Sequence, residues 1–294
     1  MRKHTEFRGT GVAVITPFKT NGEVDFQSLE RIVEHLIRGK VEYLVVLGTT
    51  GESATLNKDE KRSVAAYVRE VARKRVKLVL GIGGNDTREV IQNLGAADLR
   101  GYNAILSVSP SYNKPSQRGI IEHYKVIAKA SRLPIILYNV PGRTSSNMTA
   151  DTTLQLAAVP NIIGMKEASG NMEQVMKIIK HKPKEFLLIS GDDNLTLPIL
   201  GCGGDGVISV VANAFPKDFS EMARQALKYK MAEAQRLHYK LTDITEQLFA
   251  DGNPGGVKAV MAMMGLCKET LRLPLVPVND TVRATLRKMY RNYK

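Results

Sequence analysis

Eight short apolar runs alternate with helix-like segments through most of this 294-residue chain. The runs are rich in Val, Ile and Leu and stop near Gly, Pro, Asn or Ser, which is typical of β-strands buried on both faces. They occupy residues 12–16, 43–47, 78–82, 104–108, 135–138, 162–166, 186–190 and 206–210. The pattern predicts a repeated strand and helix order.

The segments between the runs predict helices at 25–38, 58–74, 87–99, 117–131, 150–159, 172–180 and 194–201. Strands separated by helices form a parallel sheet that is covered on its outer face, and closure into a barrel is the economical arrangement. We therefore predict an α/β fold, a (β/α)₈ TIM barrel. Such a barrel needs roughly 200–250 residues, so we assign it to 1–225.

The remaining residues, 226–294, are expected to form a C-terminal α-helical domain. Helices are predicted at about 219–231, 233–249, 255–267 and 279–292, separated by Gly- and Pro-containing breaks. In the last helix, basic residues largely share one face and apolar residues the other, which indicates an amphipathic helix with a solvated basic face. The basic residues are Arg283, Arg287, Lys288, Arg291 and Lys294; the apolar ones are Leu286, Met289, Tyr290 and Tyr293.

The formal net charge of +13 raises the possibility of nucleic-acid binding. No zinc-finger or RNP motif, and no evident helix-turn-helix, accompanies the charge, so no nucleic-acid partner is expected. We interpret the charge as an attraction for small anionic substrates.

The first residues lack the apolar stretch of a secretory signal, and no segment approaches the roughly 18 apolar residues needed to span a bilayer. We therefore expect a cytoplasmic protein without a membrane partner. Cys202 and Cys267 match no zinc or redox spacing, and we interpret both as small buried hydrophobes rather than a disulfide.

In such barrels the active site lies at the C-terminal ends of the strands, and Lys166 ends the sixth run. An amine held among apolar neighbours loses hydration, which favours the neutral form that attacks a carbonyl. A lysine at a strand end more commonly extends its ammonium into water. Its neighbours at the other strand ends therefore decide between the two interpretations.

Those neighbours supply the groups that an imine with a keto acid requires. Thr49 and Thr50 offer hydroxyl and backbone N–H groups for a carboxylate. Tyr138 offers a phenol as a proton shuttle, and Arg143 a planar cation for a second carboxylate. Each of these residues can also be explained without catalysis. The threonines could form a turn and a helix cap, Tyr138 could lie at the edge of the core, and Arg143 could be a surface arginine.

The residues at the strand ends supply fewer of the groups that other reactions require. None of the five histidines lies there, which argues against a metal-dependent aldolase and a Ser-His-Asp hydrolase, and no metal is predicted. Asp192 and Asp193 would point to opposite sides of an extended chain, so we assign them turn and capping roles. The glycine-containing segments 81–84 and 48–53 match neither the dinucleotide fingerprint nor the P-loop.

Four motifs together resemble the dihydrodipicolinate synthase family, and the match spans essentially the whole chain. They are GTTGES at 48–53, YNVPGRT at 138–144, GMKEASG at 164–170 and SGDD at 190–193. The resemblance implies a barrel with a C-terminal helical domain, assembled as a homotetramer (a dimer of dimers). It also implies condensation of pyruvate with L-aspartate-4-semialdehyde to 4-hydroxy-tetrahydrodipicolinate in lysine and diaminopimelate biosynthesis. No cofactor is implied beyond a covalent pyruvate imine on Lys166.

The same resemblance implies catalytic roles for four residues. Lys166 would form the imine and Tyr138 would shuttle protons. Thr49 would connect Tyr138 to Tyr112, which in this family reaches into the site of the neighbouring subunit.

The resemblance further implies substrate-binding residues. Thr50 would bind the pyruvate carboxylate, and Arg143 the carboxylate of the semialdehyde. Backbone carbonyls of Gly191 and Ile208 would lie near the substrate.

Two alternatives stay open on the sequence. N-acetylneuraminate lyase and the 2-keto-3-deoxy sugar acid aldolases share the barrel, the lysine and the tyrosine, but generally carry an apolar or small residue where Arg143 stands. A non-catalytic barrel that binds anions or a protein partner is a second class. Trapping of a pyruvate adduct distinguishes an enzyme from such a barrel.

A regulatory site is also implied, at Ser53, Ala54, Lys58, Lys61, Asn85, Glu89 and Ser111. In lysine-inhibited family members, histidines stand at the positions of Lys58 and Lys61, and an aromatic residue at that of Ser111. Two additional ammonium groups should repel a cationic amino acid. Our hypothesis is weak or absent feedback by lysine.

Overall fold

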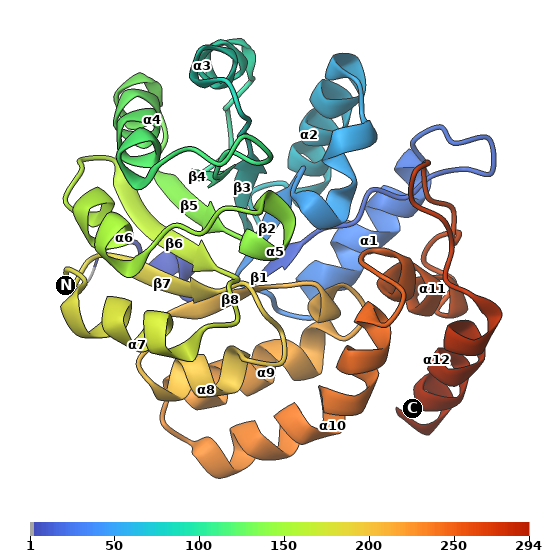
Figure 1. The fold of residues 1–294 in the computed structure, drawn as a ribbon. Helices are drawn as coiled ribbons and strands as arrows, with labels where there is room; N and C mark the ends of the chain where they lie inside the picture. The colour runs from blue at the N-terminus through green and yellow to red at the C-terminus, as the bar shows by residue number, and fades with distance from the viewer. Residues whose placement is uncertain (1–2, 294) are drawn as a thin grey trace.

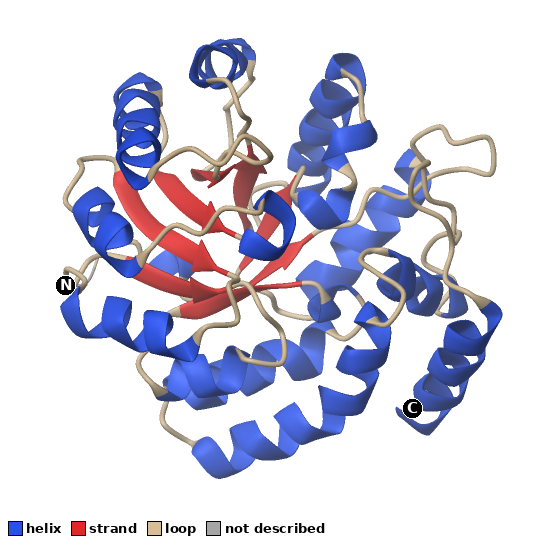
Figure 2. Ribbon diagram, viewed as in Figure 1, coloured by secondary structure: helices blue, strands red, loops and turns tan. Residues whose placement is uncertain are grey.

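Residues 3–293, described by a computed structural model, contain a closed barrel of eight parallel strands surrounded by helices (Figures 1 and 2). Each strand pairs with the next in sequence, and β8 pairs with β1. The strands are β1 Gly9–Ala13, β2 Tyr43–Val46, β3 Lys77–Gly81, β4 Ala104–Val108, β5 Ile135–Asn139, β6 Ile162–Glu167, β7 Leu187–Ser190 and β8 Gly206–Ser209. The predicted TIM-barrel fold is confirmed.

Helices cover the outer face of the barrel, and side-chain caps fix where several of them begin. The helices are α1 Phe26–Arg38, α2 Lys58–Ala72, α3 Thr87–Ala96, α4 Gln117–Ala130, α5 Pro141–Thr144, α6 Ala150–Ala157, α7 Met172–His181 and α8 Thr196–Gly201. Asn57 and Glu60 form a reciprocal capping box at the start of α2. The short helix α5, which begins with a proline at its first position, was not predicted.

Four helices follow the barrel: α9 Pro216–Leu227, α10 Met231–Phe249, α11 Gly255–Met263 and α12 Asp280–Tyr293. Helix α9 packs against β1 and β8, whereas α10 packs against α9 and α12 (Figure 1). The predicted boundary between 1–225 and 226–294 falls in the last turn of α9, and the division at that point stays a prediction.

Helix α12 has the amphipathic character predicted for it. Leu286 is fully buried, and Met289, Tyr290 and Tyr293 pack against the core. Lys294, assigned to the basic face, lies outside the described residues.

The N-terminal end of the barrel is filled by aromatic side chains. Phe7 and Tyr43 are both fully buried and meet edge to face, with ring centroids 5.6 Å apart. A Cβ atom on Gly11 would lie 2.1 Å from Cε2 of Tyr43, so glycine is required for this ring to fit. Because this end is filled, room for a site inside the barrel remains at the opposite end, where the strands terminate at their carboxyl ends.

Two expectations need correction. The first strand lies at Gly9–Ala13 rather than 12–16, because its glycines pair through the backbone but carry no apolar side chain for a pattern to detect. Cys202 is exposed and Cys267 partly buried, so the interpretation of both as buried hydrophobes is wrong, although both are free thiols. Cys202 follows α8 in a surface turn, where no packing covers it.

Within residues 3–293, no helix combines the length and the apolar character that crossing a membrane requires.

Candidate active site

Lys166 points into the barrel because the alternation of inward-facing and outward-facing side chains along β6 shifts by one residue. Ile163 belongs to the inner core and Met165 to the outer core, and the pairing with β5 is irregular opposite Ile135 and Ile136. After this irregularity, Lys166 pairs in register with Tyr138. Only 5% of Lys166 is exposed, so strand geometry delivers a buried amine beside a phenol.

The Lys166 amine faces an aromatic ring rather than a carboxylate. Its Nζ lies 4.2 Å from the centroid of the Tyr138 ring, and no carboxylate of residues 3–293 pairs with it. The adjacent Glu167 faces the other side of the strand, where it accepts hydrogen bonds from Asn139 Nδ2 and Gln174 Nε2, each at 3.0 Å. The ring face compensates only weakly for the hydration that the buried amine loses.

Lys166 and Tyr138 open onto a cavity of about 360 Å³ at the carboxyl ends of the strands. The cavity also collects four other predicted site residues: Thr49, Thr50, Arg143 and Gly191. Residues without a predicted catalytic or substrate-binding role complete its lining: Val140, Ala168, Asp192, Asp193, Asn194, Val210, Glu246, Phe249 and Asn253. Glu246, Phe249 and Asn253 come from α10 and the turn after it, so the C-terminal helices form one wall of the site.

The two threonines occupy a 3₁₀ turn, Thr49–Gly51, directly after β2. Thr16 Oγ1 fixes this turn by donating to the Gly51 carbonyl at 2.7 Å. Asn253 Nδ2 donates to Thr50 Oγ1 at 3.1 Å. Thr50 is buried and Thr49 exposed, so Thr50 lies deeper in the wall of the cavity.

A buried ion pair supports the turn from behind. The Glu52 carboxylate accepts from Lys258 Nζ and from the backbone N–H of Arg272, and Lys258 also donates to the Thr270 carbonyl at 3.0 Å. Both charged side chains are fully buried, and burial lowers the pKa of Lys258 while Glu52 opposes that change. Sequence reasoning missed this pair because its members are 206 residues apart and no local pattern joins them.

The remaining predicted residues lie at different depths. Arg143, on α5, is exposed at the mouth of the cavity. Ile208, on β8, belongs to the inner core and is not part of the cavity lining. Tyr112 is 90% exposed, and its backbone N–H donates to the Thr144 carbonyl at 3.2 Å. Within one chain, therefore, Tyr112 is not brought to Thr49 and Tyr138.

Asp192 and Asp193 organise the loop after β7, as the assignment of turn and capping roles predicted. Asp192 Oδ1 accepts from the backbone N–H of Asn194 at 3.1 Å. Asp193 is buried and accepts from the Ser209 hydroxyl and the Val210 N–H. Burial raises the pKa of Asp193 to about 6, although these hydrogen bonds oppose the change. Among residues 3–293, no group of three or more His, Cys, Asp or Glu is placed to hold a metal.

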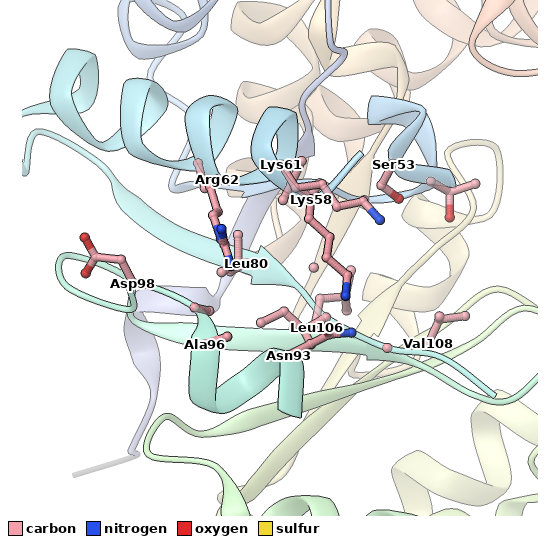
Figure 3. Close-up of a pocket in the computed structure, with 18 of the residues that line it drawn as sticks. Ser53, Lys58, Lys61, Arg62, Leu80, Asn93, Ala96, Asp98, Leu106 and Val108 are labelled. Atoms are coloured by element: carbon pink, nitrogen blue, oxygen red, sulfur yellow. The ribbon is translucent and has the colours of Figure 1, made fainter. Parts of the chain in front are cut away.

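A second cavity, of about 290 Å³, lies between α2 and α3 (Figure 3). Four residues of the predicted regulatory site line it: Ser53, Lys58, Lys61 and Glu89. Ala54, Asn85 and Ser111 lie outside its lining, and Asn85 Oδ1 accepts from the backbone N–H of Ser111 at 2.7 Å. Thr49 and Tyr138 line both cavities.

A model of the Dihydrodipicolinate synthetase family matches residues 6–292. The chain belongs to this family. It is 54% identical to the 4-hydroxy-tetrahydrodipicolinate synthase of Flavobacterium psychrophilum over 275 residues, 93% of this chain and 94% of the relative. It is 49% identical to the enzyme of the same name from Parabacteroides distasonis, over 97% of this chain and 96% of the relative.

Solved structures agree with this membership. The chloride-inhibited dihydrodipicolinate synthase from Acinetobacter baumannii, complexed with pyruvate, superposes with a TM-score of 0.95 at 40% identity. The superposition covers 97% of this chain and 98% of that one. The barrel and the helices that follow it are thus shared with this structure over 97% of the chain.

Proposed function

We propose that the chain is a 4-hydroxy-tetrahydrodipicolinate synthase, a lyase of lysine and diaminopimelate biosynthesis that condenses pyruvate with L-aspartate-4-semialdehyde. The observation that carries the proposal is the buried amine of Lys166, 4.2 Å from the Tyr138 ring centroid, in a cavity at the carboxyl ends of the strands. The curated relatives carry the synthase name, which favours this reaction over that of the neuraminate lyases and sugar acid aldolases.

Lys166 Nζ would attack the carbonyl carbon of pyruvate, forming a C–N bond, and the carbonyl oxygen would leave as water. The imine acidifies the adjacent methyl group, whose proton is removed to give an enamine. The enamine carbon then attacks the aldehyde carbon of the acceptor. The Tyr138 ring lies beside the amine, and we propose that its hydroxyl moves protons between these steps.

The rest of the cavity accounts for the carboxylates of the two substrates. Thr50, in the buried part of the turn, would hold the pyruvate carboxylate through hydroxyl and backbone donors. Arg143, at the mouth, would bind the acceptor's carboxylate by bidentate hydrogen bonds. Gly191 would present its backbone carbonyl to the bound substrate. The same role for Ile208 rests on the resemblance alone, because Ile208 is not part of the cavity lining.

Completion of the site would require a second subunit. Tyr112 projects from the chain with a left-handed backbone (φ 66°), held by the hydrogen bond to Thr144. We place its hydroxyl at the Thr49 and Tyr138 pair of a neighbouring subunit, within a homotetramer. The reaction needs no cofactor beyond the imine on Lys166, and a cytoplasmic location stays a sequence-based prediction.

Borohydride reduction in the presence of pyruvate tests the nucleophile. We expect one reduced pyruvate adduct per chain, mapped to Lys166 by mass spectrometry, and none in Lys166→Ala. Lys125→Ala, which removes an exposed lysine of α4, is the matched control and should label fully. An unlabelled wild type, or a Lys166→Ala variant with full turnover, would overturn the mechanism.

A coupled assay with aspartate semialdehyde tests the acceptor. Turnover of pyruvate with the semialdehyde is the expected result. Trapping on Lys166 without turnover of the semialdehyde would instead favour the related aldolases.

A further inference from the structure

Among residues 3–293, three carboxylate side chains line the cavity that holds Lys166. Two of them organise the loop after β7. Asp193 is buried and both of its oxygens accept hydrogen bonds, and Asp192 Oδ1 accepts from two backbone N–H groups at 3.1 and 3.3 Å. The third, Glu246 on α10, is exposed, and its carboxylate has no hydrogen-bond or ion-pair partner in the described chain.

The helix that carries Glu246 does not favour a carboxylate at this position. Helix α10 spans Met231–Phe249, so Glu246 lies in its last turn, at the negative end of the helix dipole. An anion is destabilised there, and no basic residue of that turn offsets the effect. Phe249 follows three residues later on the same face of the helix and also lines the cavity. Helix stability therefore does not explain why a carboxylate stands beside this cavity.

Arg143 is the complementary charge in the same lining. It lies on α5, which follows β5, and its guanidinium has no carboxylate partner within the part of the chain that the structure describes. Besides the amine of Lys166, the cavity thus offers a free cation from the barrel and a free anion from the C-terminal helices. A ligand that carries both a carboxylate and an ammonium group matches these two charges.

We propose that Glu246 is a specificity-determining residue that binds the ammonium group of an amino-acid acceptor, while Arg143 binds its carboxylate. The inference rests on the proposed function and extends it, because the carboxylate of aspartate semialdehyde has a partner there and its ammonium group has none. Pyruvate carries no ammonium group, so Glu246 acts on the acceptor and not on imine formation. Succinate semialdehyde has the same chain without the amine and should gain nothing from Glu246.

Steady-state kinetics of Glu246→Gln, at saturating pyruvate, test this role. The KM for aspartate semialdehyde should rise about tenfold or more, because a charge-assisted hydrogen bond to the ammonium group is lost. The inhibition constant of succinate semialdehyde, used as a competitor, should stay the same or fall, because one negative charge near its carboxylate is removed. The KM for pyruvate and borohydride trapping on Lys166 should change little, which shows that the variant is folded.

Three further variants separate this role from a general effect of charge. Asp243→Asn removes an exposed carboxylate one turn earlier on α10, outside the cavity lining, and should leave all of these constants unchanged. Glu246→Asp keeps the charge on a shorter side chain and should give a KM between those of wild type and Glu246→Gln. Asp192→Asn tests the neighbouring carboxylate, and its effect on the KM for aspartate semialdehyde should be the smaller one.

Three results would overturn the inference alone: an unchanged KM for aspartate semialdehyde in Glu246→Gln, an equal loss of succinate semialdehyde binding, or a larger effect from Asp192→Asn. Each of them requires a wild type that turns over aspartate semialdehyde. A wild type without that turnover would overturn the proposed function, and the inference with it.

Discussion

The side-chain amide of Asn253 donates a 3.1 Å hydrogen bond to the hydroxyl of Thr50, a residue 203 positions earlier. Asn253 lies in the turn between α10 and α11, whereas Thr50 follows β2 inside the barrel. The buried pair of Glu52 and Lys258 joins the same two parts of the chain. The C-terminal helices therefore form part of the wall of the cavity that holds Lys166 and are not only an appendage to the barrel.

Asn253→Ala should raise the KM for pyruvate about fivefold, with a smaller change in kcat, because one net hydrogen bond contributes about 1 kcal/mol. The bond orients Thr50, the proposed ligand of the pyruvate carboxylate. Steady-state rates with pyruvate varied at saturating semialdehyde give both constants. Asn21→Ala, in an exposed turn, is the control. An unchanged KM would show that Thr50 does not depend on this contact.

Lys258→Met should lower the free energy of unfolding by about 3–5 kcal/mol, because it leaves the Glu52 carboxylate buried without its cation. Glu52→Gln should have a similar effect for the reciprocal reason. The double variant should lose less unfolding free energy than the two single variants together, since it leaves no unpaired charge in the interior. Urea unfolding of all four proteins measures the coupling, and strictly additive losses would contradict it.

Gly191→Ala should lower kcat at least tenfold. An added Cβ would lie 2.6 Å from the Cβ of Ala168 and 3.1 Å from Cε of Lys166, so both side chains, including that of the proposed nucleophile, must give way to admit it. Gly95→Ala is the matched control, because nothing lies within 4 Å of its Cβ position and it occupies a helix. Turnover that is equal in both variants would show that the lysine tolerates the displacement.

The sequence patterns located this cavity because its deepest parts are strand ends, and strand ends are marked by local composition. Lys166 and Tyr138 end apolar runs and Thr50 lies shortly after one, so their arrival at one end of a barrel could be predicted without knowledge of packing. Glu246 and Asn253 could not be found in the same way. Their approach to the cavity depends on how α10 packs against α9. The spacing of apolar residues in α10 predicts only which face of the helix is buried.

Tyr112 could be assigned only by resemblance, since its side chain is 90% exposed and no burial within residues 3–293 explains it. Tyr112→Phe should lower kcat at least tenfold by breaking the proton relay through Thr49. Tyr239→Phe, another exposed tyrosine, should not. Because the relay is proposed to cross subunits, mixing refolded Tyr112→Phe and Lys166→Ala chains should restore activity. Mixed oligomers as inactive as their parents would show that Tyr112 does not act on a neighbour.

Asp193 should make the stability of the protein depend on pH in the direction opposite to an ordinary surface carboxylate. Burial raises its pKa in the folded state to about 6, from 3.8 in an unfolded chain. Between these values the folded state holds the proton more tightly than the unfolded state. The stabilisation from this group is therefore complete below about pH 4 and is lost as the pH rises through 6.

Asp193→Asn isolates this contribution because the amide cannot titrate. Its oxygen can still accept from Val210, and its amide nitrogen can donate to the Ser209 hydroxyl. The free energy of unfolding of the variant, relative to wild type, should rise by about 2 kcal/mol between pH 4 and pH 7, since one pKa unit corresponds to about 1.4 kcal/mol and part of the pKa difference lies below pH 4. Urea unfolding of both proteins at several pH values measures the difference, in which all other titrating groups cancel. A difference that stays constant across this range would mean that Asp193 is ionised in the folded protein at pH 4.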